Sequence, residues 1–276
     1  MFNYLKASFA RKKARRVTQE YPPKIDKIDL GKYGIISFAN WSNPLVPNFK
    51  LETPVVDFFN QFIKNGDLAI DIGANIGDTT VPIAMCTGSN GLTIGFDPNP
   101  YVFKILQTNA SLNQNKYKIA PEQFAITTKE EEFYYVSSEA SFANGGISQS
   151  KESNHGKFVY PHKITGKNLK AFLESKYPEW INKLSFIKID AEGYDKEIIK
   201  SISDLIVLCK PVVVAESIDS ASDAAKMELY DVIERNGYDI YYFEDFNINL
   251  EIKKLNKNTD MLNYKHTINI YGKPSV

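Results

Sequence analysis

The sequence contains little cysteine, little histidine and no net charge, and each shortage excludes a class of protein. Its two cysteines, Cys86 and Cys209, lie in apolar surroundings, which predicts buried thiols in a reducing compartment and no disulfide framework. The three histidines show no spacing with cysteine that is typical of a zinc site. Lysine plus arginine and aspartate plus glutamate number 33 each, so no overall field would attract a polyanion, and no nucleic-acid partner is expected.

Long apolar runs are also missing. No segment approaches the roughly 18–20 apolar residues of a membrane span, and the first residues lack the apolar stretch of a secretory signal, so a cytoplasmic location is expected. The first 19 residues nevertheless carry cations and no acid. They favour either a solvated tail or, with Phe2, Leu5 and Phe9 on one helical face, a basic helix over residues 2–16 that contacts an anionic membrane or an acidic partner. The cations are Lys6, Arg11, Lys12, Lys13, Arg15 and Arg16.

The rest of the chain divides at about residue 50. Residues 1–50 are interpreted as an N-terminal extension, irregular apart from a hairpin expected around residues 33–38, and residues 51–276 as the main domain. A helix is predicted over residues 53–63, with Thr53 as its N-cap, Pro54 in its first turn and Gly66 after its end.

From residue 68 onward, short apolar segments alternate with amphipathic ones, which is typical of an open α/β sheet with parallel strands. The last two strands follow each other without a long helix, so we expect an antiparallel pair at one edge of the sheet. The expected strands cover residues 68–72, 91–97, 117–127, 131–138, 184–190, 210–217, 238–244 and 265–272. The expected helices cover residues 77–86, 99–115, 196–202 and 223–237.

A polar insertion at residues 137–165 interrupts this alternation, and an insertion of this length near the carboxyl ends of strands is usually functional. Its segment "NGG", residues 144–146, is either a hairpin turn or a point at which the insertion folds over a bound acceptor. The aromatic residues Phe142, Phe158 and Tyr160 suit stacking on sugar rings, and a small local core explains them as well.

The segment "DIGANIG" follows the first strand, at the edge of an open α/β sheet where ligands bind. Gly73 and Gly77 permit a tight turn and close approach of a ligand. A dinucleotide fingerprint needs a further glycine where Asn75 stands, which weakens a nicotinamide or flavin site. Asp71 suits a ligand with an amine, and Asp97, 24 residues after Gly73, can accept hydrogen bonds from ribose hydroxyls. S-Adenosylmethionine combines these groups.

Four segments in this order, "DIGANIGDTT", "FDPNPYVFKILQTN", "FIKIDAEGYDKEIIKSI" and "VVVAES", resemble the FkbM-type family of S-adenosylmethionine-dependent methyltransferases over roughly residues 66–245. The resemblance implies a class I methyltransferase fold, which is Rossmann-like and doubly wound, with a mostly parallel sheet and an antiparallel edge strand. It also implies methyl transfer to oxygen, often a hydroxyl of a sugar or natural product. The residues that it implies around the cofactor are Asp71, Gly73, Asn75 and Gly77 at the methionine part, Asp97 at the ribose, and Asn99 and Ala125 near the adenine.

Three acids at the ends of two later strands are candidates for the chemistry: Asp190, Glu192 and Glu216. A carboxylate in a partly apolar pocket can have its pKa raised until it serves as a base for the acceptor hydroxyl. The same oxygen donors would suit a magnesium ion, whereas Asp190 and Glu192 could simply cap the next helix. His155 and His162, in the insertion, are alternative bases, and His266 is expected to be structural.

The leading hypothesis is therefore an S-adenosylmethionine-dependent O-methyltransferase that acts on a hydroxyl of a sugar, glycan or glycolipid. One alternative is a nicotinamide-dependent oxidoreductase on a Rossmann fold, which the residue at position 75 disfavours. The other is a non-catalytic interaction module that keeps the cofactor fold, which the set of Asp71, Asp97 and Asp190 disfavours.

Overall fold

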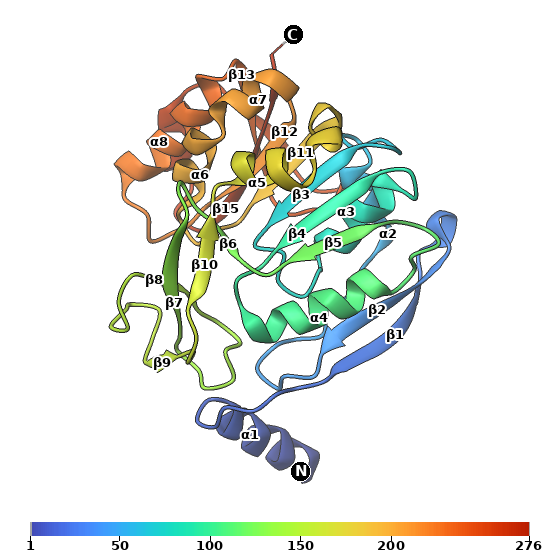
Figure 1. The fold of residues 1–276 in the computed structure, drawn as a ribbon, viewed down its shortest axis with the longest axis vertical. Helices are drawn as coiled ribbons and strands as arrows, with labels where there is room; N and C mark the ends of the chain where they lie inside the picture. The colour runs from blue at the N-terminus through green and yellow to red at the C-terminus, as the bar shows by residue number, and fades with distance from the viewer. Residues whose placement is uncertain (1, 276) are drawn as a thin grey trace.

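The computed structural model describes residues 2–275 and is organised around one large mixed sheet (Figure 1). Five neighbouring strands are parallel, and the remaining three run antiparallel to their neighbours. In spatial order the strands are β14 (Ile252–Leu255), β13 (Tyr238–Phe243), β15 (Ile268–Pro274), β12 (Val212–Ser217), β11 (Leu184–Ile189), β3 (Leu68–Ile72), β4 (Leu92–Phe96) and β5 (Ile119–Glu122).

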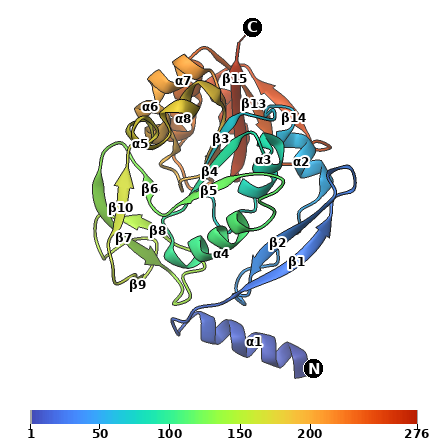
Figure 2. The ribbon, with the colours of Figure 1, turned by 45° about the vertical axis from the view of Figure 1, so that its right-hand side comes forward.

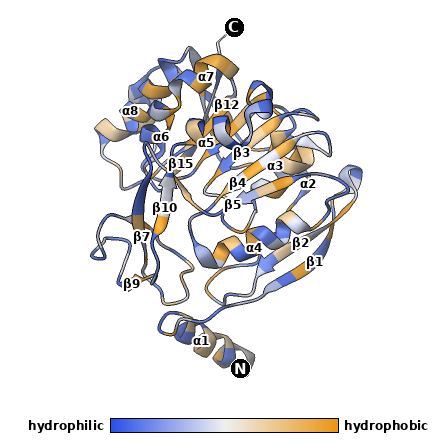
Figure 3. Ribbon diagram, in the orientation of Figure 1, coloured by the Kyte–Doolittle hydropathy of each residue, from blue (hydrophilic) through white to orange (hydrophobic). Residues whose placement is uncertain are grey.

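Helices cover both faces of this sheet, which is why its central strands are apolar without alternation. Every residue of β3 and β4 is buried, and these strands are predominantly hydrophobic (Figure 3). One face packs against α2 (Thr53–Phe59), α3 (Thr80–Thr87) and α4 (Pro100–Ser111). The other packs against α5 (Leu169–Lys176), α6 (Asp195–Ser201), α7 (Ser203–Cys209) and α8 (Asp223–Glu234). The 3-10 helices are η1 (Gly31–Tyr33), η2 (Pro178–Lys183) and η3 (Asn258–Asn263).

The hairpin expected near residues 33–38 is present, and its second strand packs into the core while its first strand is largely exposed. It consists of β1 (Pro23–Asp29) and β2 (Ile35–Trp41), and Phe38 is fully buried. The side chain of Asn109, on α4, accepts the N–H of Ala39 at 2.8 Å and donates to its carbonyl at 2.9 Å. The first helix, α1 (Phe2–Ala14), lies at the periphery near this hairpin (Figure 2).

Residues 125–167, which include the predicted insertion at residues 137–165, form a second, smaller sheet beside the carboxyl ends of the main strands (Figure 1). Its strands are β6 (Ala125–Ile126), β7 (Glu131–Ser137), β8 (Gly146–Ser148), β9 (Phe158–Val159) and β10 (Ile164–Lys167). The strand predicted over residues 117–127 is therefore two strands in different sheets. The chain leaves the main sheet at Phe124, because that ring packs against Phe96 and Phe172.

Several local predictions were wrong. Thr53 begins α2 but does not cap it, because its hydroxyl donates to the carbonyl of Leu30, and the helix ends at Phe59, well before Gly66. The helix expected from residue 77 begins at Thr80. Cys209 is only half-buried, although both thiols are free.

The antiparallel pairing of the last two predicted strands, β13 and β15, is confirmed. However, β15 inserts between β12 and β13, and the antiparallel edge is formed by β14, a strand that the sequence did not indicate. Within residues 2–275, no helix combines the length and the apolar character needed to cross a bilayer.

Candidate active site

The carboxyl ends of β3 and β11 come so close that only glycine fits at position 73. Gly73 has a φ of +76°, and a Cβ built there would lie 2.1 Å from the backbone oxygen of Asp190. Its N–H and that of Ala74 donate to the carbonyl of Phe96, at the end of β4, at 3.0 and 2.9 Å. The first glycine of "DIGANIG" thus makes room for the neighbouring strand end as well as for a turn.

Gly77 and Asn75 have different neighbours, because Gly77 packs against a helix and Asn75 lies at the cavity. Gly77 has a φ of +97° and packs against α4, where an added Cβ would meet Leu106 at 3.2 Å. Asn75 also has a positive φ, +47°, and its exposed side chain lies on the wall of the cavity described below. Residues held in this backbone region often belong to functional sites.

Asp97 ends β4 and organises the loops around it. Its carboxylate accepts the backbone N–H groups of Asn75 and Asn99, both at 2.7 Å. Burial raises the pKa of Asp97 to about 7, although these two hydrogen bonds favour the charged form. Asn99 caps α4 by accepting the N–H of Tyr101 at 3.0 Å and donates to the carbonyl of Phe142 at 2.8 Å. The insertion is thereby tied to the end of β4.

Asp71 lies behind the site, together with a lysine that sequence reasoning missed. Its side chain is fully buried and accepts the hydroxyls of Thr79 at 2.8 Å and Thr80 at 2.6 Å. Lys188, on β11, places its Nζ 3.3 Å from Oδ1 of Asp71 and 3.3 Å from Oδ2 of Asp190. A lysine inside the otherwise apolar segment "LSFIKI" was the signal that could have revealed it.

The remaining candidate acids surround Asp190. Glu192 lies on the cavity wall with a φ of +51°, and partial burial together with Asp190 raises its pKa. The pKa of Glu216 is raised to about 7 by burial and by Asp190, Asp195 and Glu192. Asp195 is buried and accepts the N–H groups of Glu216 and Ala191 at 3.0 and 3.2 Å, so it joins the β11 and β12 loops.

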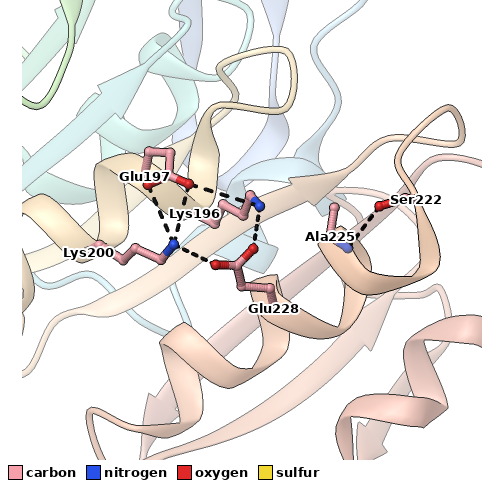
Figure 4. A network of polar contacts seen from close by, with 6 residues as sticks. All are labelled: Lys196, Glu197, Lys200, Ser222, Ala225 and Glu228. Carbon is pink, nitrogen blue, oxygen red and sulfur yellow. Dashed lines mark hydrogen bonds and ion pairs between the residues drawn. The ribbon is translucent and has the colours of Figure 1, made fainter.

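The helix that follows these acids, α6, is tied to α8 by ion pairs on the surface (Figure 4). Lys200 lies 2.6 Å from Glu228 and 3.3 Å from Glu197, and Lys196 also pairs with Glu228. Because these side chains are exposed, each pair contributes little stability. Their effect is to fix the position of α6 relative to α8, directly after the loop that carries Glu192.

These loops and the second sheet enclose a cavity of about 590 Å³. Of the predicted site residues, seven line it: Gly73, Asn75, Asp97, Asn99, Ala125, Asp190 and Glu192. Of the candidate histidines, only His155 lines the cavity among the described residues. The candidates that do not line it are Asp71, Gly77, Glu216, His162 and His266. Residues 143–149 also line it, and the "NGG" segment leads into β8, which pairs with β7 as a hairpin. Tyr135 is a lining residue that sequence reasoning missed.

The aromatic residues of the insertion form a local core. Phe142 stacks on Tyr101, with ring centroids 4.9 Å apart, and contacts Tyr160 edge-to-face at 6.2 Å. Phe158 packs against the same cluster. Of the two explanations that the sequence left open for these rings, this packing favours the small local core.

The polar and apolar residues that line the cavity fit S-adenosylmethionine. The carboxylate of Asp97 suits the two hydroxyls of a ribose, and the apolar residues Phe124, Ala125 and Ile126 offer a wall for a purine ring. A divalent ion has less support, because the described part of the chain contains no group of three or more His, Cys, Asp or Glu side chains that could hold a metal. The magnesium prediction is therefore not supported.

The strand order and the position of the cavity are those of a class I methyltransferase fold: the parallel strands run β5, β4, β3, β11, β12, and the cavity lies at their carboxyl ends, where the strand order reverses. The family model described as "Methyltransferase FkbM domain" matches residues 71–240, which is more than half of the chain. The chain belongs to the FkbM methyltransferase family, whose cofactor is S-adenosylmethionine, as the sequence motifs predicted.

Comparison with solved structures gives distant similarities. Methyltransferase FkbM from Methylobacillus flagellatus KT is 12% identical, with a TM-score of 0.44; the match covers 80% of this chain and about half, 51%, of that one. Precorrin-6y C5,15-methyltransferase from Geobacter metallireducens GS-15 is 10% identical, with a TM-score of 0.42 and coverage of 83% and 93%. Aeropyrum pernix fibrillarin with bound S-adenosyl-L-methionine is 12% identical, with a TM-score of 0.40 and coverage of 81% and 70%. The search of curated proteins gives no match.

Replacing Asp97 with alanine should weaken S-adenosylmethionine binding by about 1–3 kcal/mol, the scale for losing a charged hydrogen-bond partner. Titration calorimetry measures the change. Unchanged affinity would remove Asp97 from the cofactor site. Because the two oxygens of Asp97 accept the N–H groups of Asn75 and Asn99 separately, Asp97→Asn keeps only one of these two acceptors, and the melting temperature of both variants is measured beside the affinity.

The same carboxyl predicts a pH dependence of cofactor binding. Its pKa is raised to about 7, so it carries a proton below that pH and accepts hydrogen bonds from ribose hydroxyls less well. Affinity should therefore rise as the pH increases from about 6 to about 8 and then level off. In Asp97→Asn this rise should be absent, and its persistence there would assign it to another group.

Proposed function

We propose that this enzyme, in the cytoplasm, methylates a hydroxyl oxygen of a carbohydrate acceptor: a sugar, a glycan or the glycan part of a glycolipid. The observation that carries the proposal is that the Asp190 carboxylate and the polar segment 143–149 of the insertion line the same cavity. Asn144, Ser148 and Gln149 in that segment offer hydrogen-bond partners for a molecule rich in hydroxyls. The two free thiols accord with a reducing compartment.

In this proposal each acid has a separate task. Bound S-adenosylmethionine supplies a methyl group already activated by the sulfonium. Asp190 accepts the proton of the acceptor hydroxyl, and the cavity walls orient the hydroxyl oxygen towards the methyl carbon. Glu192 and His155, which line the same cavity, bind neighbouring hydroxyls of the acceptor. Glu216 does not line the cavity and influences Asp190 electrostatically. Asp97 and Asn99 hold the nucleoside, with Ala125 against the adenine, and Gly73, Asn75 and Gly77 shape the loop at the methionine end.

A methyl-transfer assay against a panel of free sugars, nucleotide sugars and glycan precursors tests the proposal, with S-adenosylhomocysteine release as the readout. Product found only on hydroxyl oxygens of carbohydrates would support it. Transfer to nitrogen, to carbon or to a non-carbohydrate acceptor would contradict it. Family membership favours a methyltransferase over the nicotinamide enzyme and over a non-catalytic module, and binding of S-adenosylmethionine but not of a nicotinamide dinucleotide would support the same choice.

We also propose that α1 contacts an anionic membrane. Leu5 and Phe9 are 58% and 73% exposed, and Arg11, Lys12 and Lys13 lie in the last turn. The side chain of Phe2, which the sequence assigned to the same face, lies outside the described residues. Exposed apolar residues beside cations are the combination that an interfacial helix requires.

Binding to acidic vesicles should therefore fall steeply with salt, because it depends on the cations of α1. Reversing the charge of Lys12 and Lys13 to glutamate should reduce co-sedimentation at low salt, while Lys24→Glu, on the exposed strand β1, should leave it unchanged. Activity on a soluble acceptor should persist in both. Co-sedimentation that is absent even at low salt in the wild type would restore the solvated-tail interpretation.

A further inference from the structure

Lys188 is a buried lysine in the middle of the parallel sheet. It is 4% exposed, lies between the buried residues Ile187 and Ile189, and pairs in register with Asp71 on β3. A cation in such a position is costly unless opposite charges compensate it. Its Nζ lies 3.3 Å from Oδ1 of Asp71 and 3.3 Å from Oδ2 of Asp190, so it bridges two strand ends.

The two carboxylates that Lys188 bridges differ in whether they can reach a ligand in the cavity. Oδ2 of Asp71 accepts the hydroxyls of Thr79 and Thr80, and the fully buried side chain stands back from the cavity wall, so Asp71 is not presented to a ligand. Asp190 is 38% exposed and lies on the cavity wall. Within residues 2–275 its Oδ1 has no protein hydrogen-bond partner, whereas Oδ2 accepts from Lys188. Asp71 therefore pairs with the lysine on the buried side, and the lysine pairs with one oxygen of Asp190 on the cavity side.

The charges around Lys188 keep it protonated. Burial alone would lower its pKa, but the net direction is upward because Asp71, Asp190 and Asp78 outweigh the burial. Glu216, on the adjacent strand β12, is the other titratable group that senses this cation. The lysine thus remains a full charge and a hydrogen-bond donor over the range in which an enzyme works.

We propose that Lys188 is a positioning residue for methyl transfer, which clamps Oδ2 of Asp190 so that Oδ1 faces the acceptor hydroxyl. This inference rests on the proposed function, in which Asp190 is the base. In the step, the hydroxyl proton passes to Oδ1, the oxygen forms the bond to the methyl carbon, and the sulfur keeps the electron pair of the broken carbon–sulfur bond. An Asp190 carboxylate that can rotate would present Oδ1 in that direction for only part of the time.

The test compares Lys188→Met/Asp71→Asn with Asp71→Asn alone. Asp71→Asn removes the buried charge that Lys188→Met would leave unpaired, so the double variant can fold. Lys200→Met is the matched control, because Lys200 bridges Glu197 and Glu228 on the surface, away from the cavity (Figure 4). Melting temperature, S-adenosylhomocysteine affinity, kcat, KM and the pH profile of kcat are measured for each variant.

We expect the double variant to bind S-adenosylhomocysteine as Asp71→Asn does, with kcat lower by roughly 10- to 100-fold. The acidic limb of its kcat profile should move to higher pH, because the remaining carboxylates lose a neighbouring cation. A purely structural lysine would lower the melting temperature without moving this limb. Equal kcat and equal pH profiles for the double variant and Asp71→Asn would overturn the proposal.

A crystal structure of each variant provides a readout that needs no acceptor. In the double variant the Asp190 side chain should leave the rotamer that it has in Asp71→Asn, and an unchanged rotamer would overturn the proposal. If the acceptor panel yields no carbohydrate substrate, the proposed function fails while the rotamer comparison still decides the role of Lys188.

Discussion

Asp190→Asn should lower turnover by roughly 10²–10⁴-fold, the usual contribution of a positioned base, while cofactor affinity changes little. The substitution keeps the shape of the side chain and removes its negative charge. Asp190 lies at the end of β11, next to the loop of Gly73, and its Oδ2 is held by Lys188. As the proposed base, Asp190 would act on the acceptor oxygen, so the loss should appear in kcat with saturating cofactor.

Chelation separates two explanations for such a loss. If activity of the wild type falls with EDTA and returns with magnesium, Asp190 is a metal ligand; indifference to EDTA identifies it as a base. Glu216→Gln is a useful comparison, because Glu216 stands behind the cavity wall and its loss should cost far less. Turnover of Asp190→Asn at close to the wild-type rate would reduce Asp190 to a helix cap, and Glu192 and His155 would be the next candidates.

Gly73→Ala should be the most damaging substitution of a single methyl group in the protein. The new Cβ would meet the carbonyl oxygen of Asp190 at 2.1 Å, and neither backbone can move without distorting β3 or β11. We expect the free energy of unfolding to fall by about 1–3 kcal/mol more than the φ strain alone would cost. Cofactor affinity should also fall by at least about tenfold, since the displaced strand ends carry the site.

Gly237→Ala is the matched control for this effect. Gly237 has a φ of +82°, close to that of Gly73, but an added Cβ there has no atom within 4 Å. Its cost is therefore the conformational strain alone, about 1–2 kcal/mol. Denaturant unfolding of both variants measures the difference. Equal losses of stability would show that the close approach of Asp190 does not constrain position 73.

Local chemistry was enough to predict much of the fold. The alternation of apolar and amphipathic segments indicated parallel strands such as β3, β4 and β11, because strands buried on both faces must be apolar throughout. The order of "DIGANIG", "FDPNP" and "KIDAEG" predicted the methyltransferase family and its cofactor. Strand ends on one edge of a parallel sheet must meet, so Gly73, Asp97 and Asp190 could be assigned to one site.

Pairing between distant segments was beyond the reach of those patterns. Periodicity does not specify which strands are neighbours, so neither the insertion of β15 between β12 and β13 nor the transfer of β7 to a second sheet could be predicted. The roles of Asp190, Glu192 and Glu216 could not be separated either, because they depend on which distant residues surround each side chain.

By itself the sequence determined the five parallel strands of the main sheet, their order along the chain, the glycine turn and the set of acids, because each depends on neighbouring residues. Only the tertiary structure decided that Asp71 is buried behind Lys188, that Glu216 stands back from the cavity, and that residues 143–149 form part of its wall. These facts depend on contacts between residues far apart in the chain, such as Lys188 with Asp71 across β3 and β11. A local pattern contains no information about such contacts until the sheet has formed.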